Sequence, residues 1–222
     1  MEKQKVIVLI SGGMDSVAAL YDSYEKYDVI CGLSFDYGSK HNYKEIPFAE
    51  YHCKKLKIEH KIIDLKFMNE HFSSTLLQSG GDIPEGHYES ENMKQTVVPF
   101  RNGIMLAIAA GLGESIGAAG LVIAAHSGDH AIYPDCREEF LSSMSDAVKY
   151  GTYDNIQILR PFVHMSKTEI AERGSELGID FSKTWSCYKG EDIHCGKCGT
   201  CVERIEALDK ANLVDLTNYM YK

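Results

Sequence analysis

The stretch Lys5-Val-Ile-Val-Leu-Ile-Ser-Gly-Gly-Met-Asp-Ser16 decides the fold. Its first part, Lys5–Ile10, is a short apolar run rich in β-branched residues, which is typical of a buried strand. A loop follows, and a short helix is expected over Ser16–Tyr24. The glycines let the backbone turn tightly, and the amides at a helix start point at an anion. The sequence therefore predicts an anion-binding loop directly after the first strand.

The rest of the chain continues the alternation of strands and helices. Further strands are expected at Val29–Phe35, Lys61–Leu65, Leu121–Ala125 and Ile156–Leu159, and helices at Tyr43–Lys55, Asn102–Ile116, Cys136–Tyr150 and after Ser166. This order predicts an α/β fold of the Rossmann-like type, a parallel sheet with helices on both faces. Ligands are then expected beyond the carboxyl ends of the strands. The acidic, turn-rich segment Gly80–Asn92 is interpreted as a mobile surface loop and a candidate active-site flap.

Bulk composition excludes several classes of protein. The 222 residues are 44% hydrophobic and 25% charged, as expected for one globular domain with a small appendage. No run approaches the ~18 to 20 apolar residues of a membrane span, and the first residues lack the pattern of a signal peptide. We therefore expect a cytoplasmic protein without a membrane partner. The net charge of -9, without a long basic stripe, argues against a nucleic-acid partner.

Four of the seven cysteines fall within fifteen residues near the carboxyl end, namely Cys187, Cys195, Cys198 and Cys201. In the cytosol such clustering favours a metal site over disulfides. Four thiolates close a tetrahedral shell with no open position, so the pattern predicts one structural zinc ion per chain. An iron–sulfur or redox-active use of the same cysteines is the alternative. His194 is a further possible ligand, although four sulfurs leave it no vacancy. The predicted boundary between the nucleotide-binding domain, 1–180, and a zinc-binding segment with a terminal helix, 181–222, follows from this cluster.

The loop belongs to neither of the two common phosphate motifs, because GxxxxGK[ST] and GxGxxG are both absent. Its SGGxDS pattern after a first strand resembles the PP-loop of the ATP pyrophosphatases, which split ATP between the α and β phosphates. Together with the segments TWSCY…HCGKCGTCxxR and Tyr133–Arg137, it resembles the 7-cyano-7-deazaguanine synthase family of queuosine biosynthesis. The likeness runs from about Lys5 to Leu208. It departs at Ser39-Lys40, where that family typically has Gln-Arg, and at Phe100, where glycine is common.

The resemblance implies a ligase that uses ATP with Mg²⁺. Its substrates would be 7-carboxy-7-deazaguanine and ammonia, and its product would be 7-cyano-7-deazaguanine, formed through adenylated intermediates. A carboxylate is a poor electrophile, so activation as an acyl adenylate fits the loop chemistry. We expect ammonia to come from outside the chain. The resemblance also implies a homodimer.

Site residues are assigned on this basis. The expected nucleotide-binding residues run through the loop and the helix after it: Ile10, Ser11, Gly12, Gly13, Met14, Asp15, Ser16, Val17, Ala18, Ala19 and Leu20. Asp15 is also a candidate Mg²⁺ ligand, and Lys167 is expected to steady developing phosphate charge. Arg101 and Arg137 are candidates for the substrate carboxylate or the α-phosphate.

The base of the substrate is expected to meet acceptors and an aromatic ring. Asp129 and Asp135 are candidates to accept from the guanine-like edge, and Tyr37 to flank the ring. Structural ion pairs and core packing are the competing interpretations of these three residues. His126, His130 and Phe35 are weaker candidates.

Three other functions remain open at this point. The first is a PP-loop tRNA-modifying enzyme that transfers sulfur, which predicts a basic RNA-binding surface and a reactive cysteine. The second is a non-catalytic nucleotide sensor or zinc-ribbon interaction module, which predicts a degenerate phosphate loop. The third is a related amidating ligase that stops at the amide.

Overall fold

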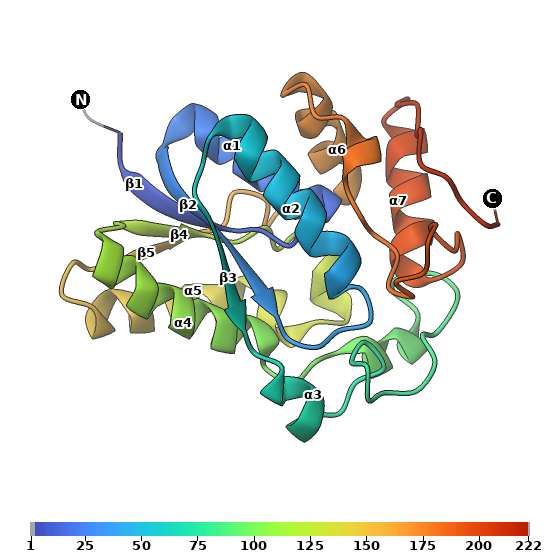
Figure 1. The fold of residues 1–222 in the computed structure, drawn as a ribbon, viewed down its shortest axis with the longest axis horizontal. Helices are drawn as coiled ribbons and strands as arrows, with labels where there is room; N and C mark the ends of the chain where they lie inside the picture. The colour runs from blue at the N-terminus through green and yellow to red at the C-terminus, as the bar shows by residue number, and fades with distance from the viewer. Residues whose placement is uncertain (1–2, 222) are drawn as a thin grey trace.

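A five-stranded, wholly parallel sheet forms the centre of the computed structural model, which describes residues 3–221 (Figure 1). The spatial order of the strands is β3-β2-β1-β4-β5, so the chain reverses its direction of winding at β1. The strands are β1 (Lys5–Leu9), β2 (Asp28–Asp36), β3 (His60–Asp64), β4 (Gly120–Val122) and β5 (Gln157–Leu159). In such a sheet, ligands bind in the crevice where the strand order reverses, here between β1 and β4.

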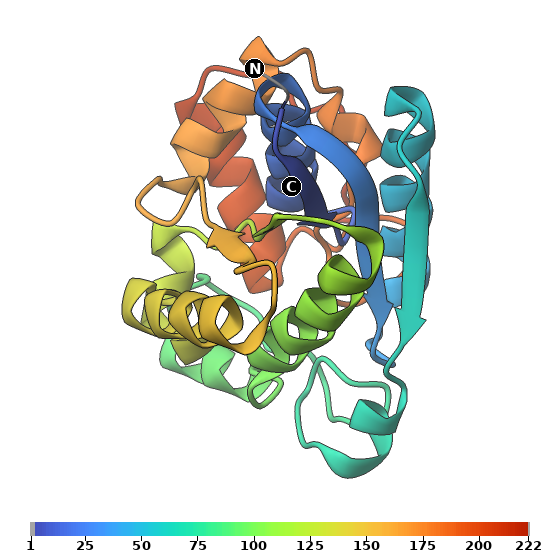
Figure 2. The same cartoon turned by 90° about the vertical axis from the view of Figure 1, so that its left-hand side faces the viewer.

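Helices cover both faces of the sheet, as predicted. They are α1 (Met14–Lys26), α2 (Asn42–Leu56), α3 (Phe67–His71), α4 (Arg101–Ile116), α5 (Glu138–Gly151), α6 (Lys167–Glu176) and α7 (Gly199–Lys210). Short 3-10 helices occupy Glu91–Thr96, Ser127–Ala131, Pro134–Cys136 and Phe181–Lys183. Helices α1, α2 and α6 lie on one face, with α7 packed on α6, whereas α4 and α5 lie on the other (Figures 1 and 2).

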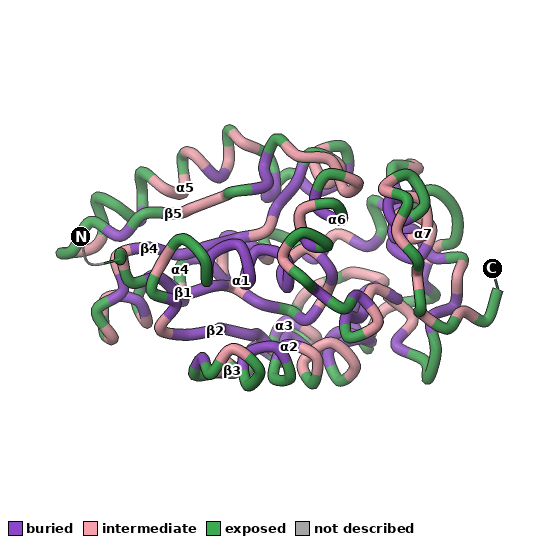
Figure 3. Tube along the Cα trace, turned by 90° about the horizontal axis from the view of Figure 1, so that it is seen from above, coloured by how far each residue is buried: buried purple, intermediate pink, exposed green. Residues whose placement is uncertain are grey.

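Strand β1 is the most enclosed part of the sheet. Val6 and Val8 point into the core beneath α1, and Ile7 between them points into the core beneath α4. All three side chains are fully buried, and β1 and β2 appear as buried segments in Figure 3. A central parallel strand is covered on both faces, which explains why its sequence is apolar throughout rather than alternating.

All five predicted strands are present, but some predicted bounds were wrong. Strand β4 ends at Val122 rather than Ala125, because the chain then leaves the ladder and turns at His126 into a 3-10 helix. Helix α5 begins at Glu138 rather than Cys136, because Pro134–Cys136 forms its own turn and Arg137 is extended. Helix α1 runs longer than expected, from Met14 to Lys26. The capping box predicted at Ser166 is present, with Glu169 as its partner.

The segment Gly80–Asn92 is less exposed than predicted. Ile83 and Tyr88 are buried in the same core as α4, and the Gly86 amide donates to the Lys197 carbonyl. Lys40 also reaches this segment, where its ammonium group donates to the Gly80 carbonyl at 3.1 Å. The segment therefore packs between the sheet domain and the cysteine-rich segment.

The carboxyl-terminal segment shares its core with the sheet. Ala207 and Leu208 of α7 belong to the apolar cluster beneath α1. The fully buried Arg204 donates to the Thr184 hydroxyl and to the Phe181 carbonyl, both at 2.7 Å. The boundary at residue 180 stays a prediction.

One stretch among the described residues, Glu91–Ile116, is long and apolar enough to cross a membrane. Half of its most apolar window is buried inside the protein. Packing of α4 against the sheet accounts for that composition.

Candidate active site

A deep pocket opens at the carboxyl ends of β1, β2 and β4, where the strand order reverses. The loop after β1 lines it with Ser11, Gly13 and Asp15, and the segment after β4 lines it with Ala125 and Asp129. Residues from β2, α2, α4, α6 and the cysteine-rich segment complete its walls. The pocket therefore lies at the edge of the sheet where the sequence predicts ligands to bind.

The loop after β1 is organised by its two serine hydroxyls. Ser16 Oγ accepts from the amides of Ser11 and Gly12, at 3.2 and 3.3 Å. Ser11 Oγ accepts from the Gly13 amide at 3.1 Å. These amides converge at the start of α1, which is the arrangement that holds anionic phosphate oxygens.

Gly12 is fixed by a close approach of α2. Its φ of +101° lies in a region that side chains rarely adopt. A Cβ at this position would meet the Glu45 carbonyl oxygen and would lie 2.9 Å from the Ala49 amide nitrogen. The first turn of α2 thus packs directly on the backbone of the loop, and only glycine permits this contact.

A buried ion pair faces the loop. Lys167, the first residue of α6, lies 2.5 Å from Asp15 and 3.3 Å from Glu203 of α7. Burial raises the pKa of Asp15, but the charges of Lys167 and His126 more than offset this, so its pKa is lowered overall. Burial also opposes the charge on Lys167, yet Asp15 and Glu203 raise its pKa. Asp15 Oδ1 is buried without a hydrogen-bond partner among residues 3–221, so this carboxylate has an oxygen available for a cation or an incoming donor.

Asp129 continues the polar wall of the pocket, and the buried His126 lies beside it, with Nε2 3.5 Å from the Asp129 carboxylate. Asp129 closes the 3-10 turn after β4, because its carboxylate accepts from the His126 amide at 3.2 Å. The other carboxylate oxygen accepts from the Tyr88 hydroxyl at 2.8 Å. His126 Nε2 lies 3.9 Å from the Asp15 carboxylate. The turn after β4 therefore stands next to the loop after β1.

Opposite the loop lies a tyrosine cluster, formed by Tyr37, Tyr88, Tyr133 and Tyr188. All four side chains line the pocket. The hydroxyls of Tyr133 and Tyr188 are 3.2 Å apart, and the rings of Tyr88 and Tyr133 are 6.0 Å apart. Burial raises the pKa of each of the four, so all remain neutral hydrogen-bonding groups at neutral pH.

Arg101 joins this cluster to the rest of the pocket. Its guanidinium lies over the Tyr37 ring at 5.4 Å and donates to the Tyr37 hydroxyl at 3.1 Å. It is the first residue of α4, and Phe100 before it adopts a left-handed conformation. Arg101 and Tyr37 were both predicted as site residues, and the structure brings them together.

Other predicted residues do not reach the pocket wall. Val17, Ala18, Ala19 and Leu20 are fully buried in the core beneath α1, because they lie on the faces of the helix that pack against the sheet and α6. These four side chains pack in the core, and their assignment to nucleotide binding stays a prediction.

Asp135 and Arg137 also lie outside the pocket lining. Asp135 is buried, and its carboxylate accepts from the Asn102 amide at 2.8 Å, which satisfies the amino end of α4. Arg137 is exposed, and its Nε donates to the His130 carbonyl at 2.9 Å. Both side chains thus make structural contacts here, and their predicted roles toward the substrate stay predictions.

Several site residues were missed in the sequence. Tyr133 and Tyr188 stand in segments that carry the family resemblance, but neither was given a role, and Tyr88 comes from a segment that no motif marks. Glu203 and Glu45 are missed for a different reason, since glutamates on predicted helices usually face solvent. One signal was available for Glu45, because it stands four residues after His41, and this spacing places the two on one helical face.

The four predicted cysteine ligands converge. Their sulfur atoms all lie within 4.8 Å of one another, and all four residues are buried. Cys195 Sγ and Cys201 Sγ are 3.9 Å apart, close to the edge of about 3.8 Å expected for a tetrahedron with ~2.3 Å zinc–sulfur bonds. His194 is not part of the group, since its Nε2 accepts from the Ser186 amide. The geometry fits a metal ion with a closed sulfur shell.

The metal segment adjoins the pocket. Tyr188 follows the ligand Cys187, and Thr200 precedes the ligand Cys201, and both line the pocket. Thr200 also donates to the Ser186 carbonyl at 2.7 Å. A metal ion bound by the cysteines would therefore hold part of the pocket wall in place.

Comparison with known proteins places this pocket in a family. Residues 5–212 match the family model described as queuosine biosynthesis protein QueC. The chain belongs to the QueC family. It is 55% identical over 220 residues to the 7-cyano-7-deazaguanine synthase of Porphyromonas gingivalis strain W83, with 99% of both chains covered. It is 50% identical over 214 residues to that of Desulfotalea psychrophila, with 96% of this chain and 98% of the relative covered.

Solved structures show the same fold outside the QueC family. The U34-tRNA thiolase NcsA from Methanococcus maripaludis, solved with its 4Fe-4S cluster, has a TM-score of 0.55 and 16% sequence identity. The match covers 96% of this chain and 66% of the thiolase. At that identity the likeness concerns the fold alone, which confirms the predicted Rossmann-like architecture.

Proposed function

We propose that this QueC-family chain is a ligase that converts 7-carboxy-7-deazaguanine and ammonia to 7-cyano-7-deazaguanine, with ATP consumed through adenylated intermediates. One observation carries the proposal: the SGGxDS loop and the Arg101–tyrosine cluster line a single pocket. The loop suits a pyrophosphate, and the cluster suits a flat heteroaromatic acid. The names of the full-length relatives support the same assignment.

The phosphate side of the pocket supplies positive potential without a Walker lysine. The amides of Ser11, Gly12 and Gly13 stand at the start of α1, where they now donate to the Ser16 and Ser11 hydroxyls, and a phosphate oxygen would replace these hydroxyls as the acceptor. Ser11 and Ser16 can rotate their hydroxyls from each other, now 3.1 Å apart, to an incoming phosphate. Lys167 reaches the same side and carries a proton throughout the physiological pH range. These groups stabilise the charge that develops on the departing pyrophosphate.

The substrate side fits the shape and the hydrogen-bonding edge of a deazaguanine. The tyrosine cluster offers flat faces to a ring system. Asp129 offers an acceptor for the N–H and amino groups of a guanine-like edge, since each carboxylate oxygen can accept more than one hydrogen bond. The planar guanidinium of Arg101 can donate two parallel hydrogen bonds to the substrate carboxylate before it is activated.

The chemistry follows from bringing these two sides together. An oxygen of the substrate carboxylate attacks the α-phosphorus, and pyrophosphate leaves into the loop. Ammonia then attacks the acyl carbon and AMP departs, which leaves an amide. A second adenylation, at the amide oxygen, releases a second pyrophosphate and one of the two N–H protons, and makes that oxygen a leaving group. Loss of AMP and of the remaining N–H proton then yields the nitrile.

The four cysteines are proposed to bind zinc. Four sulfur ligands leave no position for water, so the ion would stabilise the segment next to the pocket and take no part in the reaction. Mg²⁺ is proposed beside Asp15, whose unpartnered Oδ1 is an oxygen ligand of the kind this ion prefers. Bound there, it would neutralise charge on the triphosphate. The homodimer and the cytoplasmic location implied by the family resemblance stay predictions.

Product mass tests the proposal. The protein is incubated with 7-carboxy-7-deazaguanine, ammonium, Mg²⁺ and ATP, and the products are identified by mass spectrometry. The nitrile is the expected product. Accumulation of only the amide would indicate the related amidating ligase instead. A parallel incubation with tRNA and a sulfur donor separates the sulfur-transfer function, which predicts ATP consumption that depends on tRNA.

A further inference from the structure

Glu45 occupies a position between the two sides of the pocket. It stands in the first turn of α2 and lines the pocket with a side chain that is 12% exposed. One carboxylate oxygen lies 3.5 Å from where a Cβ on Gly13 would stand, against the phosphate loop. The other lies 3.8 Å from His41 Nε2, which in turn is 3.4 Å from the Tyr37 hydroxyl beneath Arg101. The carboxylate thus lies where an acyl group activated by the loop would meet the substrate side.

Neither oxygen of Glu45 has a hydrogen-bond donor within residues 3–221 of the protein. The nearby His41 is not a counter-ion, because burial, reinforced by Arg101, lowers its pKa to about 3 and keeps it neutral. The Glu45 side chain is 12% exposed, so its carboxyl group loses most of its contact with water and gains no protein donor in exchange, which is costly to the fold. Its placement at the centre of a reaction pocket is therefore better explained by chemistry than by stability.

The groups that face Glu45 set its protonation. Burial raises the pKa of Glu45 to about 8, Arg101 of α4 opposes the rise, and Asp15 of α1 adds to it. Tyr37 and His41 are neutral neighbours on the loop before α2. A carboxyl group that titrates close to working pH can take up and release a proton within one turnover.

We propose that the Glu45 carboxylate is the general base that accepts the proton of the attacking nitrogen when ammonia displaces AMP from the acyl adenylate. The inference rests on the proposed function. The nitrogen lone pair forms the C–N bond, and the bond between the acyl carbon and the phosphate oxygen breaks with its electron pair going to AMP. The nitrogen then carries one proton too many, and this proton passes to Glu45. The products are the primary amide, AMP and a protonated Glu45, which returns its proton to water.

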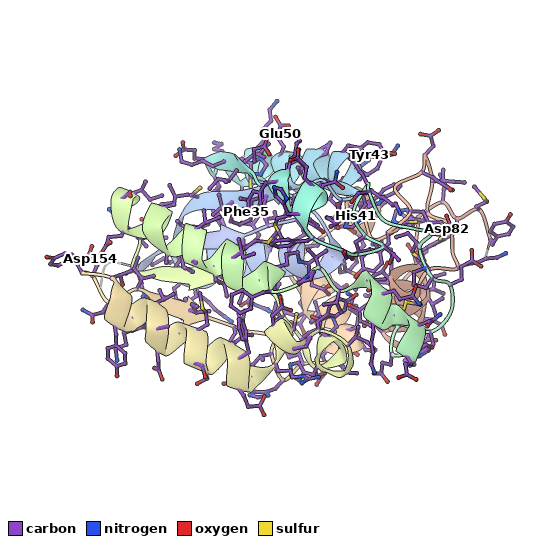
Figure 4. All side chains as sticks on the ribbon, turned by 90° about the horizontal axis from the view of Figure 1, so that it is seen from below. Phe35, His41, Tyr43, Glu50, Asp82 and Asp154 are labelled. Atoms are coloured by element: carbon purple, nitrogen blue, oxygen red, sulfur yellow. The ribbon has the colours of Figure 1, made fainter. Side chains whose placement is uncertain are left out.

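Glu45→Gln tests the assignment, because it keeps the shape of the side chain and removes its basicity. Glu50→Gln is the matched control: Glu50 stands in the same helix but is exposed, and it lies at the edge of the molecule whereas His41 lies inside (Figure 4). Two partial reactions are measured. Exchange of pyrophosphate with ATP in the presence of the acid reports adenylation, and single-turnover formation of the amide reports attack by ammonia.

We expect Glu45→Gln to keep the exchange rate within about threefold and to slow amide formation about 100-fold or more, as for removal of a general base. Hydroxylamine is a weaker base than ammonia and is largely unprotonated near neutral pH, so it should still trap the acyl adenylate in this variant. Glu50→Gln should match the wild type in both assays. At a fixed concentration of free ammonia, the rate of amide formation by the wild type should rise with pH through a group of pKa about 8, and Glu45→Gln should lose that rise.

Amide formation at the wild-type rate in Glu45→Gln would overturn the assignment. An equal loss of exchange and of amide formation would also overturn it, since the residue would then only shape the site. Glu45→Asp serves if the glutamine variant does not fold; it should retain the pH-dependent rise at a lower rate, and a flat profile would count against the proposal. Absence of acid-dependent exchange in the wild type itself would instead refute the proposed function.

Discussion

Replacing Gly12 by alanine probes the contact that holds the phosphate loop against α2. The φ of +101° disfavours any side chain by about 1 to 2 kcal/mol. The new Cβ would also overlap the Glu45 carbonyl and press on the Ala49 amide, both of which are backbone atoms that yield only if α2 moves. Overpacking of this kind costs about 1 to 3 kcal/mol. We expect Gly12→Ala to lower the free energy of unfolding by about 2 to 5 kcal/mol.

Gly111→Ala is the matched control. Gly111 lies within α4 on an exposed turn, and a Cβ there meets nothing within 4 Å. Alanine in a helix interior is better than glycine by about 0.5 to 1 kcal/mol, so this variant should be more stable than the wild type.

Thermal unfolding followed by circular dichroism measures both variants on the metal-loaded protein. For a chain of this size, 1 kcal/mol corresponds to about 2 to 4 °C. Gly12→Ala should therefore melt about 4 to 20 °C lower, and Gly111→Ala about 1 to 4 °C higher. A Gly12→Ala protein that melts within 1 °C of the wild type and retains full activity would refute the claim that α2 packs on this loop.

Three further outcomes follow from the site. Asp15→Ala should abolish turnover while the zinc content, measured by mass spectrometry of the metal, stays at that of the wild type; full activity in this variant would remove Asp15 from the site. Tyr88→Phe should lose the hydrogen bond to Asp129 at a cost of about 1 kcal/mol and raise KM for the acid about fivefold, with little change in kcat, and an unchanged KM would show that Asp129 does not depend on that bond. Because the pKa of Glu45 is about 8 in the folded chain and about 4.3 in an unfolded one, the folded state holds an extra proton between these values. Stability should therefore fall by about 2 kcal/mol as the pH rises from 6.5 to 8, and urea titrations should show no such fall in Glu45→Gln.

A fourth outcome concerns the metal. Removal of the ion by a chelator should lower the melting temperature and weaken binding of the acid, because Tyr188 and Thr200 stand next to ligands. A chelated protein with wild-type affinity would show that the metal segment does not support the pocket.

The fold was predictable from the sequence because its signals are local. The apolar run at Lys5–Leu9 and the loop after it place a strand, a turn and a helix start within twelve residues. The cysteine cluster is equally local, since its spacing alone brings four sulfurs within reach of one ion. Lys167 was singled out because it opens the helix that follows the last strand, and the structure places it 2.5 Å from Asp15 of the loop.

The substrate side was harder to predict because it is assembled by tertiary structure. Tyr88 comes from a segment that its composition marks as exposed, yet burial of Ile83 and Tyr88 fixes it against Asp129. Asp135 is the opposite case: its motif favoured a substrate contact, whereas in the structure its carboxylate accepts from the Asn102 amide at the amino end of α4. The residue type and the motif around it do not by themselves distinguish a side chain that lines the pocket from one that satisfies the end of a helix.

The identity of the nucleotide products tests the central claim most directly. The wild-type protein is incubated with ATP, Mg²⁺, ammonium and 7-carboxy-7-deazaguanine, and the phosphorus-containing products are resolved by nuclear magnetic resonance. If the loop after β1 holds a departing pyrophosphate, the products should be AMP and pyrophosphate, and they should form only when the acid is present. Formation of ADP and phosphate, or release of AMP at the same rate without the acid, would contradict the account.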